Sequence, residues 1–156
     1  MRNQMGFSLY ECMTCMVVLS VLTTLAVPSI RCMQNRVAFR NEVFQLVRSL
    51  QAGRIVAVKR NCPVVFVADG NSYTIFVDDG SGNGCSGDWD RQQGEDVITR
   101  RVLPAGINLT TNFTRNRTRF RNGIGNKGGR VFISDSIGAR MEVILSISGR
   151  IRVRKS

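Results

Sequence analysis

The sequence of 156 residues contains no histidine. Such a chain has no imidazole to act as a general base and no histidine ligand for a metal. It also lacks a nucleophile elbow and a phosphate-cradling loop, so we expect no enzymatic activity and no cofactor. Two carboxylate-rich loops leave calcium open beside the plainer interpretation of solvated loop residues: Asp78 with Asp79, and Asp88 with Asp90.

Acidic residues are scarce in the last third of the chain. Residues 1–99 hold nine basic and nine acidic side chains, whereas residues 100–156 hold thirteen basic and two acidic ones. The whole formal net charge of +11 therefore lies in that third, where Lys127 and Lys155 are the only lysines. This block predicts a polyanionic partner such as nucleic acid, an anionic membrane surface or an acidic protein face. The alternative is a solvated basic surface that only aids solubility.

Five cysteines divide into two groups. Cys12, Cys15 and Cys32 lie in or beside an apolar stretch, where small buried hydrophobes are the expected role. Cys62 and Cys85 lie beyond it and could pair in an oxidising compartment. Closing that loop would stabilise the fold by about 3 kcal/mol in the chain-entropy model.

One long apolar run covers residues 12–30, after the short polar segment MRNQMG. Its length approaches the roughly 20 residues that cross a bilayer, and it exceeds the apolar core of a secretory signal. No A-x-A cleavage pattern follows it. We therefore predict a retained transmembrane helix over residues 7–30.

A helical pattern continues beyond this run. Val37, Phe44, Val47, Leu50 and Ile55 recur near three- and four-residue spacing, with charged residues between them. This spacing predicts an amphipathic helix over residues 31–60 that continues the first one. We expect a single helix over residues 7–59.

After Cys62 and Pro63 the apolar period changes from helical to two. The turn residues Asp69-Gly70-Asn71 separate two β-rich segments, which indicates a hairpin. The segments that we expect to be extended are 63–69, 73–78, 96–103, 106–110, 130–135, 140–148 and 151–155. The sequence thus predicts an α+β protein in which the long helix packs on a C-terminal antiparallel β domain over residues 61–156.

The segment GFSLYE, residues 6–11, resembles the class III signal of type IV pilins and type II secretion pseudopilins. A short leader ends in Gly6, Phe7 follows, and Glu11 is the fifth residue after that point. The resemblance implies a type IV pilin fold, a leader over residues 1–6, and a prepilin peptidase that cuts after Gly6 and methylates Phe7. It also implies a single-pass protein of the inner membrane, with its globular domain in the periplasm until assembly into a filament.

A lone carboxylate within an apolar helix needs an explanation, because a bilayer disfavours it by several kcal/mol. Cleavage after Gly6 would create an α-amino group at Phe7, four residues from Glu11. In a bundle of such helices, Glu11 of one subunit can pair with the amine of another and set their register. The alternative is a side chain that reaches the membrane interface from near the helix end.

The rest of the chain resembles the minor pilin group that includes FimT, FimU and the pseudopilin GspH. The segments that carry the resemblance are FQLVRSLQAGRIVAVKRN, VLPAGINLT, GGRVFISD and SGRIRV. The last contains a GRxR motif, Gly149 to Arg152, which in FimT-like pilins is linked to DNA binding during natural transformation. The resemblance implies a minor type IV pilin whose partners are other pilin subunits and DNA. The alternatives are a GspH-like pseudopilin of type II secretion and a FimU-like subunit that initiates assembly at the pilus tip.

Two arginine arrays are the candidate DNA-binding residues. Side chains two apart share one face of an extended strand, and guanidinium groups suit phosphate oxygens. We therefore expect contacts to the phosphate backbone without sequence preference, the alternative being a solvated strand face. The arrays are Arg150, Arg152 and Arg154 with Lys155, and Arg115, Arg117, Arg119 and Arg121.

Overall fold

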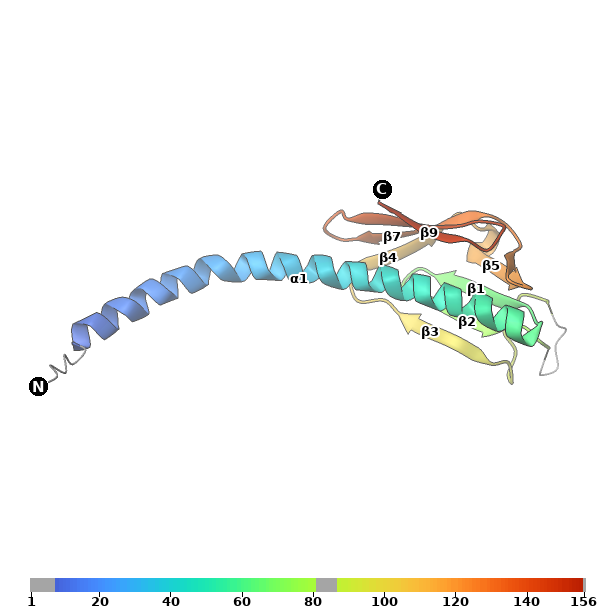
Figure 1. Cartoon of the computed structure of the whole chain (residues 1–156), viewed down its shortest axis with the longest axis horizontal. Coiled ribbons are helices and arrows are strands. Elements are labelled where there is room, and N and C mark those ends of the chain that lie inside the picture. Colours follow the sequence, from blue (N-terminus) through green and yellow to red (C-terminus); the bar gives the residue numbers. More distant parts are fainter. Residues whose placement is uncertain (1–7, 81–86, 156) are drawn as a thin grey trace, which may run out of the picture. The chain divides into compact units, whose positions relative to one another are not determined.

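The computed structural model describes residues 8–80 and 87–155, which include one long helix followed by nine strands (Figure 1). The helix, α1, runs from Leu9 to Arg60 and passes through Pro28 without interruption. The helix expected over residues 7–59 is thus confirmed in its described part. Contacts divide the chain into two compact units, residues 1–38 and 39–156.

The first unit consists of the first half of α1. Most apolar side chains described in this unit, among them Leu9, Met16 and Met33, are exposed. Four hydroxyl groups donate hydrogen bonds to carbonyl oxygens of the preceding helical turn, so they need no outside partner; they belong to Thr14, Ser20, Thr23 and Thr24. The membrane span expected over residues 7–30 is not found: within the described residues, no helix is long and apolar enough to cross a membrane.

The second half of α1 buries a single stripe of side chains. Phe39, Val43, Leu46, Leu50 and Ala57 are buried at helical spacing.

The apolar face expected from the sequence was partly wrong. Phe44 and Ile55 are 54% and 55% exposed, and Val37 in the first unit is exposed as well. In the second half of α1, apolar residues occupy two opposite stripes, and spacing alone merges them into one face.

Strands from both halves of the β domain form a five-stranded antiparallel sheet in the order β3-β2-β1-β5-β6. The hairpin expected around Asp69-Gly70-Asn71 is confirmed, since Asp69 of β1 pairs with Ser72 of β2. Residues 117–121, whose arginine spacing suits one face of an extended strand, form β5. The strand bounds are β1 Val64–Asp69, β2 Ser72–Val77, β3 Val97–Val102, β5 Arg117–Arg121 and β6 Ile124–Gly125.

A second antiparallel sheet has four strands in the order β4-β7-β8-β9. Its strands are β4 Ile107–Thr111, β7 Gly129–Asp135, β8 Arg140–Leu145 and β9 Ile151–Lys155. Between β4 and β5 the chain makes a short 3₁₀ turn, η1 Thr114–Asn116, in which Arg115 and Asn116 both have positive φ. Each of the strands expected from the sequence is thereby confirmed.

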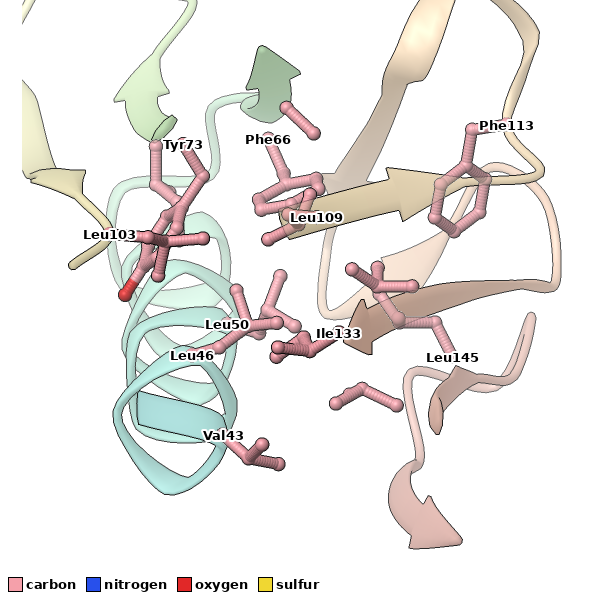
Figure 2. Close-up of a cluster of buried hydrophobic side chains, with 14 of the residues drawn as sticks. Val43, Leu46, Leu50, Phe66, Tyr73, Leu103, Leu109, Phe113, Ile133 and Leu145 are labelled. Carbon is pink, nitrogen blue, oxygen red and sulfur yellow. The ribbon is translucent and has the colours of Figure 1, made fainter. Parts of the chain in front are cut away.

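The core lies between the helix and the inner faces of both sheets. Figure 2 shows Leu46 and Leu50 of α1 beside Ile133 of β7 and Leu109 of β4, with Phe66 of β1 nearby. All five side chains are at most 2% exposed and belong to one cluster. The α+β fold with a helix packed on antiparallel sheets is therefore confirmed.

An ion pair joins α1 to the edge of the five-stranded sheet. Arg101 of β3 donates to both carboxylate oxygens of Glu42, at 2.7 and 3.0 Å, and Glu42 is almost fully buried. These hydrogen bonds raise the pKa of Arg101 above its ordinary value. Next to them, burial raises the pKa of Tyr73, whose hydroxyl lies 3.3 Å from that of Ser49.

Candidate functional site

The helix start carries the residues expected to be processed and to direct assembly. Gly6 and Phe7 lie outside the described residues, so cleavage and methylation stay predictions. Glu11 is exposed, and its Oε2 accepts a hydrogen bond of 3.4 Å from the backbone N–H of Ser8. The spacing Ser8-x-x-Glu11 is that of a capping box, in which the glutamate satisfies a free N–H of the first turn. Glu11 therefore has a local role at the helix start, and its pairing with another subunit stays a prediction.

Arginines of β9 lie on the outer face of the four-stranded sheet. Pairing aligns Arg130 of β7 with Ile144 of β8 and Ile144 with Arg152 of β9. On the same face of β8, Glu142 aligns with Arg154 of β9. Because neighbouring strands align their pleats, these side chains share the face opposite the buried Val131 and Val143.

Sequence reasoning missed two members of this surface. Arg130 and Arg140 project from the same face as Arg152 and Arg154, because their strand neighbours Val131 and Met141 alternate to the core side. The period-two alternation within β7 and β8 could have revealed them. We call Arg130, Arg140, Arg150, Arg152 and Arg154 the basic sheet face.

Little acidic charge opposes the basic sheet face. Glu142 is largely buried, and its Oε2 lies 3.6 Å from Nη1 of Arg130. Arg150 precedes β9 and is exposed, as are Arg152 and Arg154. Lys155 alternates to the other side of β9, so the structure separates it from the three arginines with which it was grouped.

The second predicted array behaves differently. Arg117, Arg119 and Arg121 share the outer face of β5, as expected, since Thr118 and Phe120 between them are buried. Arg117 donates to the carbonyl oxygen of Trp89 at 3.0 Å and to Asp90 at 2.8 Å.

Arg119 completes this attachment. It donates to the carbonyl oxygen of Gly87 at 3.0 Å, and its guanidinium stacks 4.3 Å from the centre of the Trp89 ring. Two of the four arginines thus hold a neighbouring loop. Arg121 is exposed on β5, whereas Arg115 is exposed in η1, outside the extended segment on whose face it was expected.

Buried carboxylates also hold that loop. Asp78 is fully buried and accepts hydrogen bonds from the backbone N–H groups of Gly87 and Trp89, at 2.7 and 3.2 Å. Glu95 accepts from Gly80 and Gln92. We call residues 87–96 the Trp89 loop. In the described parts of the chain, no group of three or more histidine, cysteine or acidic residues is arranged to hold a metal ion.

Only one of the two cysteines expected to form a disulfide lies within the described residues. Cys62 is partly buried against the core, and its thiol donates to the carbonyl oxygen of Arg60 at 3.2 Å. Cys85 lies outside the described residues, so its pairing with Cys62 stays a prediction. Cys12, Cys15 and Cys32 are exposed on α1 rather than buried.

Comparison with known proteins gives two results. The family described as type II transport protein GspH matches residues 42–149. A solved structure, the minor pseudopilin EpsH from the type 2 secretion system of Vibrio cholerae, matches with a TM-score of 0.56 at 10% sequence identity. The match covers 74% of this chain and 95% of EpsH. No curated protein sequence matches the chain.

These results separate the alternatives that the sequence left open. They support the GspH-like alternative better than a pilin for natural transformation, and they do not support DNA binding. The EpsH likeness concerns the fold alone at this identity, whereas the GspH match extends over most of the chain, from Glu42 on α1 to Gly149 before β9. The chain belongs to the GspH family.

Proposed function

We propose that this chain is a minor pseudopilin, a structural subunit without catalytic activity that joins other pilin or pseudopilin subunits in a filament for type II secretion. The single observation that carries the proposal is the GspH match over residues 42–149. The fold shared with EpsH supports it, because that protein is a minor pseudopilin of a type 2 secretion system.

The proposal includes processing at the N-terminus. A prepilin peptidase at the inner membrane removes residues 1–6 and methylates Phe7, and the second unit lies in the periplasm. The GFSLYE signal supports this step. In the filament, Glu11 pairs with the α-amino group of a neighbouring subunit. Its exposure near the helix start supports this role, because a carboxylate there can reach an amine outside its own chain.

The test is co-expression of the full chain with a prepilin peptidase and filament components. Mass spectrometry should show loss of the leader and gain of one methyl group on Phe7, and Gly6→Val should stay uncleaved. Glu11→Gln should be processed normally and yet be depleted from sheared filaments, whereas Glu142→Gln, on the basic sheet face, should be recovered with them. An uncleaved wild-type chain, or full recovery of Glu11→Gln, would contradict the proposal.

A second candidate function is DNA binding, which the unpaired arginines at the β9 end of the basic sheet face favour. Arg150, Arg152 and Arg154 are exposed, and none has an acidic partner within 4.0 Å in the described residues. Arginines at such spacing can contact successive phosphates of a nucleic acid backbone.

Salt dependence tests this candidate. Binding of mixed-sequence duplex DNA by the full chain in neutral detergent should weaken with salt, with a log–log slope of about 0.9 per phosphate engaged. The double variant Arg150→Gln/Arg152→Gln should lower that slope by about 2. The matched control Arg91→Gln/Arg100→Gln removes the same charge elsewhere and should leave the slope unchanged. Equal effects of the two pairs, or no binding at low salt, would rule out this candidate.

A further inference from the structure

An exposed stripe runs along the second half of α1, on the side away from the core. Its members are four and three residues apart in alternation: Phe44, Arg48, Gln51, Ile55 and Val58. This alternation averages 3.5 residues and is the spacing at which one helix meets another along a seam. We call these five residues the outer stripe.

The apolar members of the outer stripe are left uncovered by the β domain. Phe44, Ile55 and Val58 are 54%, 55% and 58% exposed, whereas Val43, Leu46 and Leu50 beside them are at most 1% exposed. Three large apolar side chains in line on one helix face form an uncovered patch of the kind that marks protein interaction sites.

A hollow lies at the C-terminal end of the outer stripe. This open hollow of about 440 Å³ is lined by Gln51, Ile55 and Val58 of the stripe, with Arg54 and Lys59 at its side. The turn at Gly123 lies against Val58, since a Cβ there would come within 2.8 Å of Cγ2. Arg54 is held in place by its hydrogen bond of 3.0 Å to the carbonyl oxygen of Gly123. The hollow is open to solvent and has room for an apolar side chain of a partner.

Charge beside the outer stripe has one sign. Arg40, Arg48 and Lys59 are exposed on the same half of α1, and none has an acidic partner within 4.0 Å in the described residues. The one acidic residue of this helix half is Glu42, which is buried in its pair with Arg101. An occupant of this face therefore meets apolar side chains and positive charge together.

We propose that the outer stripe docks an amphipathic helix of a different polypeptide, one whose apolar seam is flanked by acidic residues. Its apolar side chains would pack on Phe44 and Ile55 and enter the hollow at Val58, while its carboxylates face the basic residues. A second copy of this chain is the poorer occupant, because its net charge is also +11 and its own helix presents the same cations. The inference rests on the filament role and names the chemistry of one neighbour there.

The probe is a synthetic helical peptide of about three heptads with leucine along the seam and glutamate at the flanking positions. A matched peptide carries lysine instead of glutamate. Binding to the full chain in neutral detergent is measured by fluorescence anisotropy. The glutamate peptide should bind, more weakly as salt is raised, and the lysine peptide should not bind. No binding of the glutamate peptide, or equal binding of both, overturns the proposal.

Two variants with a matched control locate the binding. Ile55→Glu/Val58→Glu should weaken binding of the glutamate peptide by about tenfold or more, as expected where buried anchors are lost. Val102→Glu/Ile137→Glu places the same two charges on other exposed apolar positions and should leave the affinity within about twofold. These positions are both 67% exposed, so neither change threatens the fold. Equal losses in the two variants would overturn the proposal.

Two further results separate this inference from the filament role. Disulfide cross-linking between copies of Ile55→Cys that clearly exceeds that of the wild type, whose own exposed cysteines give the background, would assign the stripe to a second copy and overturn the heterotypic partner. A wild-type chain that is processed and recovered in filaments but binds neither peptide overturns the inference alone. Failure of processing would instead overturn the proposed function, whatever the peptides do.

Discussion

The outer faces of the two sheets carry arginines at the same spacing and use them differently. On β5 of the five-stranded sheet, Arg117 and Arg119 hold the Trp89 loop through carbonyl oxygens, Asp90 and an aromatic ring. On β9 of the four-stranded sheet, Arg152 and Arg154 are exposed. The pattern of a strand therefore predicts which face an arginine occupies, and a segment distant in sequence decides whether it is free to bind a partner.

The largest expected effect tests whether the two sheets, which use their outer arginines differently, share one core on their inner faces. Ile75 of β2 and Ile133 of β7 are both fully buried in the shared core. Ile75→Ala and Ile133→Ala should each lower the free energy of unfolding by about 2–5 kcal/mol, because each leaves a cavity. Chemical denaturation measures both. A loss below about 1 kcal/mol in only one of them would show that the sheets do not share one cooperative core.

The next effect removes the buried anchor of the Trp89 loop. Asp78→Ala leaves the N–H groups of Gly87 and Trp89 without their acceptor and should lower the free energy of unfolding by about 2–3 kcal/mol. Trp89 is the only tryptophan, so its fluorescence reports the release of the loop. The control Asp69→Ala, at an exposed turn, should change stability by less than about 0.5 kcal/mol. An unchanged Trp89 spectrum in Asp78→Ala would contradict this role.

A matched pair of arginine substitutions compares the two faces directly. Arg117→Gln should cost about 1 kcal/mol of unfolding free energy, since its side chain is only 25% exposed and bonds to Trp89 and Asp90. Arg152→Gln should stay within about 0.5 kcal/mol of the wild type. Thermal or chemical unfolding measures both. Equal costs would remove the distinction between the faces.

The smallest effect concerns pH and the inner side of the five-stranded sheet. Burial raises the pKa of Tyr73 above its ordinary value, so its neutral form is favoured in the folded state. Its contribution to stability is therefore complete below about pH 10, the pKa of an unperturbed tyrosine, and is lost as pH rises through the higher folded value. Tyr73→Phe should unfold with a flatter pH dependence above pH 10. An identical dependence in both proteins would contradict the raised pKa.

Much of the fold followed from the sequence because its signals are local. The β-rich apolar runs around Val64–Asp69 and Ser72–Val77, with a glycine turn between them, set both strands and their pairing. The exposure of Phe44 and Ile55 could not be predicted this way, because the sheets cover only one side of the helix and leave these two side chains uncovered. The role of Arg117 in holding the Trp89 loop could not be predicted either, since its partner Asp90 lies 27 residues away in the sequence. Such contacts depend on where the loop returns to the sheet, which no local pattern records.

The pairing of β1 has a consequence for the order in which this protein folds. β1 meets β2 across a tight turn. Its other neighbour is β5, and that pairing places Val64 opposite Phe120, which is distant in the sequence. Local hairpins close sooner than distant strand pairs, because the entropy of closing a long loop must be overcome first. The Trp89 loop has two of its holding side chains on β5, so its docking is complete only after that late strand arrives. Tryptophan fluorescence should therefore change in the last phase of refolding, after the β1–β2 amides are already protected from hydrogen exchange.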